Sequence, residues 1–230
     1  MQIFICGDST AASYNPEETR MVGWGQLLGD YLPGVTVVNL SMAGRSTKTF
    51  LAEGRLEPAG QADPGDLVLI QFAHNDENEK KPERYTAPWT EFTENLRFFI
   101  RFAREHGAAP VLLTPICMRI WQDGKLQPTH GEYPAAMRAV AEETDVPLID
   151  LYTESFRIVE TRILQIGRPK GQFRHFIAAA ADDPGFPAHI QRPGGARPGS
   201  GDIQRLKGHG EERIPFPALA AASITPVAVP

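Results

Sequence analysis

The sequence is poor in cysteine and has no long hydrophobic run. Its two cysteines, Cys6 and Cys117, lie in or beside short apolar stretches, so we expect reduced core residues rather than a disulfide or a pair of metal ligands. No apolar run approaches the about 18 residues that a membrane helix needs, so we expect no membrane partner. The first residues, MQIFIC, lack the features of a secretory signal. We therefore expect a soluble, cytoplasmic protein.

An excess of positive charge is also missing. The net charge is −5, which does not favour a nucleic-acid partner. Neither G-x-x-x-x-G-K-[ST] nor G-x-G-x-x-G occurs, which disfavours a nucleotide site. The absence of G-x-S-x-G disfavours the nucleophile elbow of α/β-hydrolases. What remains is a chain of 230 residues, 42% of them hydrophobic, long enough for one large domain.

Short apolar runs alternate with helical patterns along the chain. Runs this short and continuous are typical of strands buried on both faces, as in a parallel sheet. The expected strands are 3–6, 35–40, 66–73, 110–116 and 146–151, and the expected helices are 23–32, 88–107 and 133–145. This alternation predicts a three-layer α/β/α sandwich around a parallel sheet of about five strands.

Polar segments follow the first three expected strands. They are GDST (7–10), NLSMAGRS (39–46) and FAHND (72–76). Functional residues of open parallel sheets gather beyond the carboxyl ends of the strands. Ser9 could supply a nucleophilic hydroxyl and a backbone N–H, Gly44 a second N–H, and the Asn75 amide a third donor to an oxyanion. The alternatives are that Ser9 caps a helix and that Asn75 and Asp76 belong to a polar loop.

The three motifs at these spacings resemble the SGNH (GDSL-like) hydrolase family, and more narrowly its rhamnogalacturonan acetylesterase branch. The resemblance covers about residues 1–160 and implies the flavodoxin-like fold of that family. It also implies that Ser9 is the nucleophile and that Ser9, Gly44 and Asn75 form the oxyanion hole. One departure is Ala73, which stands where the family usually has glycine. No cofactor and no metal are implied.

Three further residues are candidates to line the substrate site. His74 lies beside Asn75 and is expected to be structural or substrate-lining rather than a base. His130, in THGEYP, is expected to shape the pocket or its loop. Arg119 could contact an acidic sugar, although a solvated surface position is an equally good interpretation.

The catalytic base is the missing part of the pattern. The family supplies it from a D-x-x-H motif near the carboxyl end, and no such motif follows residue 150. The late histidines are His175, His189 and His209, of which His189, with Asp183 or its neighbour Asp182, is the best substitute. A serine hydrolase without its base keeps only the activity that its oxyanion hole supplies.

The composition changes near residue 166. Residues 167–230 contain nine glycines and nine prolines, and basic residues outnumber acidic ones there. We expect a hydrolase domain over 1–166 and a poorly ordered or aberrant tail over 167–230. The prolines and glycines of this tail are incompatible with the long last helix that the family has. One hypothesis is that the sequence after about residue 160 is read out of frame.

The resemblance implies an esterase that removes acetyl groups from pectin-derived saccharides through an acyl-enzyme. Its partner would be an acetylated saccharide, and the oligomeric state stays open. Two alternatives remain: an SGNH esterase acting on acetylxylan, a lipid or a thioester, and a protein that keeps the fold but lacks a working base.

Overall fold

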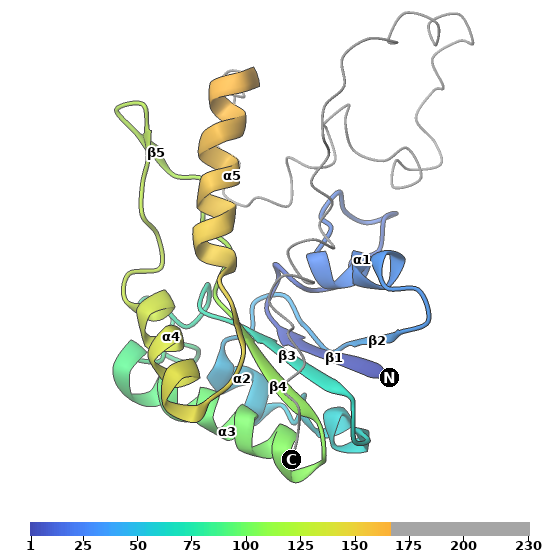
Figure 1. Cartoon of the computed structure of the whole chain (residues 1–230). Helices are drawn as coiled ribbons and strands as arrows, with labels where there is room; N and C mark the ends of the chain where they lie inside the picture. The colour runs from blue at the N-terminus through green and yellow to red at the C-terminus, as the bar shows by residue number, and fades with distance from the viewer. Residues whose placement is uncertain (167–230) are drawn as a thin grey trace, which may run out of the picture. The chain divides into compact units, whose positions relative to one another are not determined.

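Five parallel strands form the central sheet of the computed structural model, which describes residues 1–166 (Figure 1). Their order across the sheet is β2-β1-β3-β4-β7. The strands are β1 (Gln2–Gly7), β2 (Thr36–Asn39), β3 (Leu67–Gln71), β4 (Ala109–Leu113) and β7 (Leu148–Ile149). This arrangement confirms the predicted α/β fold with its five-stranded parallel sheet.

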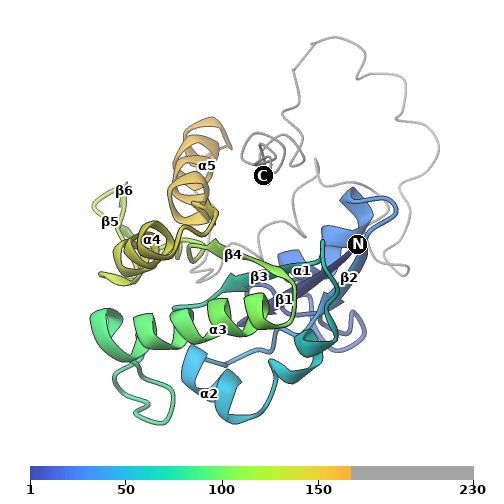
Figure 2. The ribbon, with the colours of Figure 1, turned by 60° about the horizontal axis from the view of Figure 1, so that its bottom comes forward.

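Helices cover both faces of the sheet (Figure 2). Helices α2, α3 and α4 pack on one face, while α1 and the first residue of α5 pack on the other. The helices are α1 (Trp24–Tyr31), α2 (Thr47–Ala52), α3 (Thr93–Glu105), α4 (Tyr133–Thr144) and α5 (Leu151–Ile166), with short turns η1 (Glu57–Gln61) and η2 (Pro88–Phe92). A small hairpin, β5 (Trp121–Gln122) and β6 (Lys125–Leu126), precedes α4.

The strands are buried on both sides, as their continuous apolar runs predict. In β1, Phe4 and Cys6 point into the core under α2, α3 and α4, whereas Ile3 and Ile5 point into the core under α1. Three phenylalanines, Phe50, Phe72 and Phe99, pack against one another in the first core, with ring centroids 5.2–5.7 Å apart. The sheet is thereby held rigidly between two apolar layers.

Several boundaries differ from the sequence prediction. The expected helix 88–107 begins as a π-helical turn, η2, before α3 continues it to Glu105. The last strand is only two residues long, because Asp150 ends it and α5 begins at once. Both cysteines are buried and free, as predicted. None of the helices within residues 1–166 combines the length and the apolar character of a membrane-spanning segment.

Candidate active site

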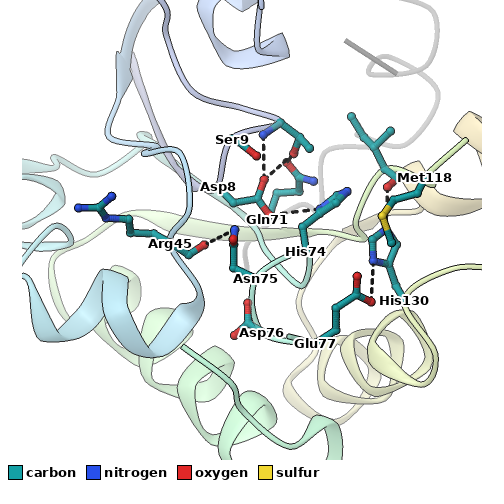
Figure 3. A network of polar contacts seen from close by, with 12 residues as sticks. Asp8, Ser9, Arg45, Gln71, His74, Asn75, Asp76, Glu77, Met118 and His130 are labelled. Carbon is teal, nitrogen blue, oxygen red and sulfur yellow. Dashed lines mark hydrogen bonds and ion pairs between the residues drawn. The ribbon is translucent and has the colours of Figure 1, made fainter. Parts of the chain in front are cut away.

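The three polar segments singled out in the sequence lie at one edge of the sheet. They follow β1, β2 and β3, which are neighbours and run parallel, so Ser9, Gly44 and Asn75 stand beyond three adjacent carboxyl ends. In Figure 3 the side chain of Asn75 is directed toward the turn that carries Ser9. The placement agrees with the predicted oxyanion hole, whose chemical roles stay predictions.

Hydrogen bonds of the neighbouring residues fix the turn after β1 that contains Ser9. Oδ1 of Asp8 accepts hydrogen bonds from the Thr10 backbone N–H (2.9 Å) and hydroxyl (2.8 Å). The Tyr14 hydroxyl donates to the Ser9 carbonyl oxygen at 2.7 Å. Asp8 and Thr10 are buried, while Ser9 between them is partly exposed. A rigid turn therefore presents the Ser9 side chain at the surface.

Gln71, at the end of β3, joins this turn to the neighbouring strand. Its Oε1 accepts a hydrogen bond from the Trp24 indole N–H (2.9 Å) and lies 2.8 Å from the Thr10 hydroxyl oxygen, whose single hydrogen Asp8 and Gln71 share. Gln71 is fully buried, so these bonds are shielded from water. The Ser9 turn is thus anchored to β3 as well as to β1.

Gly44 adopts a conformation that favours glycine. Its φ is +81°, in the left-handed region. The nearest atom to a Cβ built on it would be Nη1 of Arg84, at 3.7 Å. The backbone can therefore turn sharply here, and a guanidinium lies close to it.

The Asn75 amide is held from both ends. Its Nδ2 donates to the Arg45 carbonyl oxygen at 3.0 Å, and its Oδ1 accepts from Nη1 of Arg84 at 3.0 Å. An amide nitrogen carries two hydrogens. One of them is bound to Arg45, so the second is available to an oxyanion.

The departure at residue 73 has a structural consequence. Ala73 follows β3 with φ +127° and is fully buried. L-residues with a side chain rarely adopt this conformation, which glycine tolerates readily. The backbone that delivers Asn75 therefore keeps a glycine-like shape although alanine occupies it.

His74 forms a buried ion pair behind Ser9. Its Nδ1 lies 3.3 Å from Oδ2 of Asp8, and the two side chains are 6% and 0% exposed. Burial, the largest single effect, disfavours the charged ring, but the charge and hydrogen bond of Asp8, together with the Glu77 charge and the Ile116 carbonyl, outweigh it and raise the pKa of His74. Burial also disfavours the Asp8 carboxylate, yet His74 and the Thr10 hydrogen bonds lower the pKa of Asp8. This geometry agrees with a structural role for His74, and its contact with substrate stays a prediction.

His130 lies beneath the surface next to His74. The ring centroids are 4.2 Å apart, and the His130 side chain is fully buried. Its Nε2 donates to the Ile116 carbonyl oxygen at 2.9 Å, and its Nδ1 lies 3.1 Å from a Glu77 carboxylate oxygen. Burial and the charge of His74 lower the pKa of His130. His130 braces the wall of the site, and contact with substrate stays a prediction.

Arg119 lies between β4 and the β5–β6 hairpin and is partly exposed. Burial lowers the pKa of its guanidinium. Its contact with an acidic sugar stays a prediction. His189 and Asp183, like the expected tail, lie outside the described residues. Within residues 1–166, no group of three or more His, Cys, Asp or Glu side chains could hold a metal ion.

Asp76 has a larger part in the site than the sequence indicated. Its Oδ1 accepts from the Thr47 N–H (2.9 Å) and hydroxyl (2.6 Å) and from the Thr86 hydroxyl (2.8 Å). Its Oδ2 is buried and accepts no hydrogen bond from the described residues. Burial raises the pKa of Asp76 to about 7, against the effect of these bonds. Asp76 thereby fastens the Asn75 loop to the start of α2.

Arg84 is the other residue that the sequence analysis missed. It lies nine positions after Asn75, in a stretch without a regular pattern, and contacts Asn75 only because the loop folds back. A basic residue in a polar loop carries no sequence signal for such a contact.

Comparison with known proteins agrees with this geometry. The GDSL-like lipase/acylhydrolase family model matches residues 5–182. Rhamnogalacturonan acetylesterase RhgT of Bacillus subtilis is 37% identical over 94% of this chain and 92% of its own length. The probable rhamnogalacturonan acetylesterase YesY of the same organism is 41% identical over 66% of this chain and 71% of its own length.

A solved structure shares the fold. The crystal structure of protein YxiM from Bacillus subtilis has a TM-score of 0.65 and 29% identity, covering 77% of this chain and 52% of its own. The RhgT match necessarily extends past residue 166, into the segment for which the sequence predicts an aberrant tail; the nature of that segment stays a prediction. With three quarters of its length matched by the family model, this chain belongs to the GDSL-like lipase/acylhydrolase family.

Proposed function

We propose that this protein is a serine acetylesterase that removes acetyl groups from pectin-derived, rhamnogalacturonan-type saccharides. The similarity to RhgT along 94% of the chain supports the substrate class. The observation that carries the chemistry is the Asn75 amide, held at the sheet edge beside the Ser9 turn with one N–H available.

The reaction proceeds in two stages. The Ser9 hydroxyl attacks the acetyl carbonyl, and the negative charge on the carbonyl oxygen is stabilised by the Ser9 and Gly44 N–H groups and by the Asn75 amide. The bond between the acetyl carbon and the sugar oxygen then breaks, the sugar oxygen takes up the proton that Ser9 lost, and acetyl-Ser9 remains. Water then attacks the acyl-enzyme and releases acetate, regenerating Ser9.

The proton transfers require a base that residues 1–166 do not provide in an evident position. His74 faces Asp8, His130 faces Glu77 and Ile116, and His106 lies at the end of α3. His189, oriented by Asp183, remains the candidate from the sequence.

Acetate release from acetylated rhamnogalacturonan oligosaccharides tests the proposal, with acetylated xylan and longer acyl esters as competing substrates. We expect the rhamnogalacturonan substrate to be preferred and Ser9→Ala to abolish both turnover and labelling by a fluorophosphonate probe. Full labelling of the Ser9→Ala protein would place the nucleophile elsewhere. Preference for another ester would reject the substrate class.

A further inference from the structure

One cation approaches the predicted oxyanion hole. Nη1 of Arg84 donates a hydrogen bond to Oδ1 of Asn75 and also lies 3.7 Å from the position that a Cβ on Gly44 would take. The Arg84 side chain is 23% exposed, so water screens its charge only in part. Arg84 therefore stands beside two of the three expected donors.

The loop that carries Arg84 is ordered by its own hydrogen bonds. The Arg84 N–H donates to the Lys81 carbonyl at 3.0 Å, and the Thr86 N–H donates to the Asp76 carbonyl at 3.1 Å. The Thr86 hydroxyl also binds the buried Asp76 carboxylate. These bonds fix the backbone on both sides of Arg84, so its side chain starts from a defined position.

Arg84 decides which way the Asn75 amide faces. A guanidinium can only donate, and a carbonyl oxygen can only accept. Arg84 therefore requires Oδ1 on its side, and Arg45 requires Nδ2 on the other side. A flipped amide would set donor against donor and acceptor against acceptor. Together the two contacts fix the direction in which the second Nδ2 hydrogen points.

The positive charge also acts through the amide. A charged donor on Oδ1 polarises the amide and strengthens the N–H bonds that Nδ2 makes. Glu83 offsets this charge weakly, because its carboxylate is 3.7 Å from Nε of Arg84 and its side chain is 62% exposed.

We propose that Arg84 is a positioning residue of the esterase reaction, which orients and polarises the Asn75 amide so that it donates to the oxyanion. This inference rests on the proposed function. Arg84 contacts no reacting atom itself, so its removal should slow the chemical step without weakening substrate binding. A lysine at this position would keep a charge but lose the planar fork of donors.

The first test needs no activity. In ¹H–¹⁵N spectra of the full chain, the Asn75 side-chain amide is assigned as the pair of signals lost in Asn75→Ala. We expect Arg84→Met to shift this pair and Lys80→Met, an exposed charge on the same loop, to leave it in place. An unmoved pair in Arg84→Met would overturn the proposal, whether or not the protein turns over an ester.

The second test uses p-nitrophenyl acetate. We expect Arg84→Met to lower kcat about tenfold, less than the loss of a complete oxyanion donor, with KM little changed, and Arg84→Lys to recover part of the loss. In an Asn75→Ala background, Arg84→Met should have no further effect. An equal loss in both backgrounds would show that Arg84 acts elsewhere. Absence of turnover in the unaltered chain would count against the proposed function, while the spectra still decide the contact.

Discussion

Ala73 is a single residue whose backbone conformation opposes its side chain. It is buried with φ +127°, and such strain costs on the order of 1 kcal/mol or more. We predict that Ala73→Gly raises the free energy of unfolding by about 1 kcal/mol, measured by urea denaturation.

The matched control is the same substitution inside a helix. Ala103 is buried in α3, and Ala103→Gly should lower stability by about 1 kcal/mol or more. A lower stability of the Ala73→Gly variant would mean that the lost methyl contacts outweigh the backbone strain.

Asp76 makes stability depend on pH. Its folded pKa is raised to about 7, whereas an unfolded aspartate titrates near pH 4. The folded state therefore keeps a proton that the unfolded state loses, and stability falls as the pH rises from about 4 to about 7. We predict that Asp76→Asn removes the contribution of Asp76 to this decrease in the free energy of unfolding, measured by urea denaturation at several pH values.

Asp30→Asn provides a control, because Asp30 is exposed on α1. It should leave the pH profile as it is in the unaltered chain. If the stability of Asp76→Asn decreased with pH as much as that of the unaltered chain, Asp76 would not be the group responsible.

The Asp8–His74 pair should also make the free energy of unfolding depend on pH. The contribution of His74 falls as the pH rises, whereas that of Asp8 falls as the pH drops. The raised pKa of His74 gives stability that is present below about pH 6.5 and lost as the pH rises through the folded pKa. The lowered pKa of Asp8 gives stability that is lost as the pH falls through its folded value.

Removal of one partner would leave a buried charge. His74→Ala should therefore destabilise the fold by about 3–5 kcal/mol at neutral pH. The Asp8→Asn/His74→Ala double variant should recover part of that loss. Thermal or urea unfolding measures the stability of both variants. A double variant that is no more stable than His74→Ala alone would rule out the unpaired Asp8 charge as the cause of the loss.

At the scale of the element, α5 depends on one side chain at its start. Asp150 accepts hydrogen bonds from Thr114, from the Thr153 backbone and hydroxyl, and from the Arg138 guanidinium at 3.0–3.1 Å. It thereby ties α5 to both β4 and α4. We predict that Asp150→Ala lowers the free energy of unfolding by about 2 kcal/mol.

Glu154→Ala supplies the comparison for Asp150. Glu154 forms an exposed pair with Arg157 within α5, and its loss should cost about 0.5 kcal/mol or less. Equal effects of the two substitutions would show that Asp150 does not anchor the helix.

The elements differ in how well the sequence predicted them. The four longer strands were placed correctly within a few residues, because buried parallel strands leave continuous apolar runs. Helix α2 was not predicted, since its six residues rely on the Ser46–Thr49 capping box rather than on an apolar pattern. Helix α5 was not predicted either: much of its apolar surface, such as Tyr152 and Phe156, packs on the small cluster around the β5–β6 hairpin rather than on the main core.

At the scale of the whole molecule, the edge of the sheet at which Ser9, Gly44 and Asn75 lie could be predicted, because each belongs to the segment that follows a strand. What the sequence did not show are contacts between loops, such as Arg84 with Asn75 and Asp76 with Thr47 and Thr86. These depend on how segments far apart in the chain meet, which no local pattern records. The base, by contrast, is a prediction for residues 167–230.

That prediction can be tested on the intact chain. Because no D-x-x-H motif follows residue 150, we expect weak turnover of p-nitrophenyl acetate and recovery of activity when an in-frame D-x-x-H ending is restored. Single His175→Ala, His189→Ala and His209→Ala variants locate a base if turnover is robust. Robust turnover that is lost in His189→Ala would overturn the expectation of an impaired enzyme and identify the base.

The strand order has a consequence for self-association. The outermost strands are the shortest, with four residues in β2 and two in β7, while the long, apolar β1 and β3 lie inside. A second molecule that pairs with either edge strand therefore meets few unpaired backbone N–H and C=O groups. Short edge strands are one way in which proteins avoid edge-to-edge aggregation. Within residues 1–166, the longest apolar strands are therefore paired on both sides in the native sheet, and their backbone groups become available to a second molecule only when the sheet itself opens.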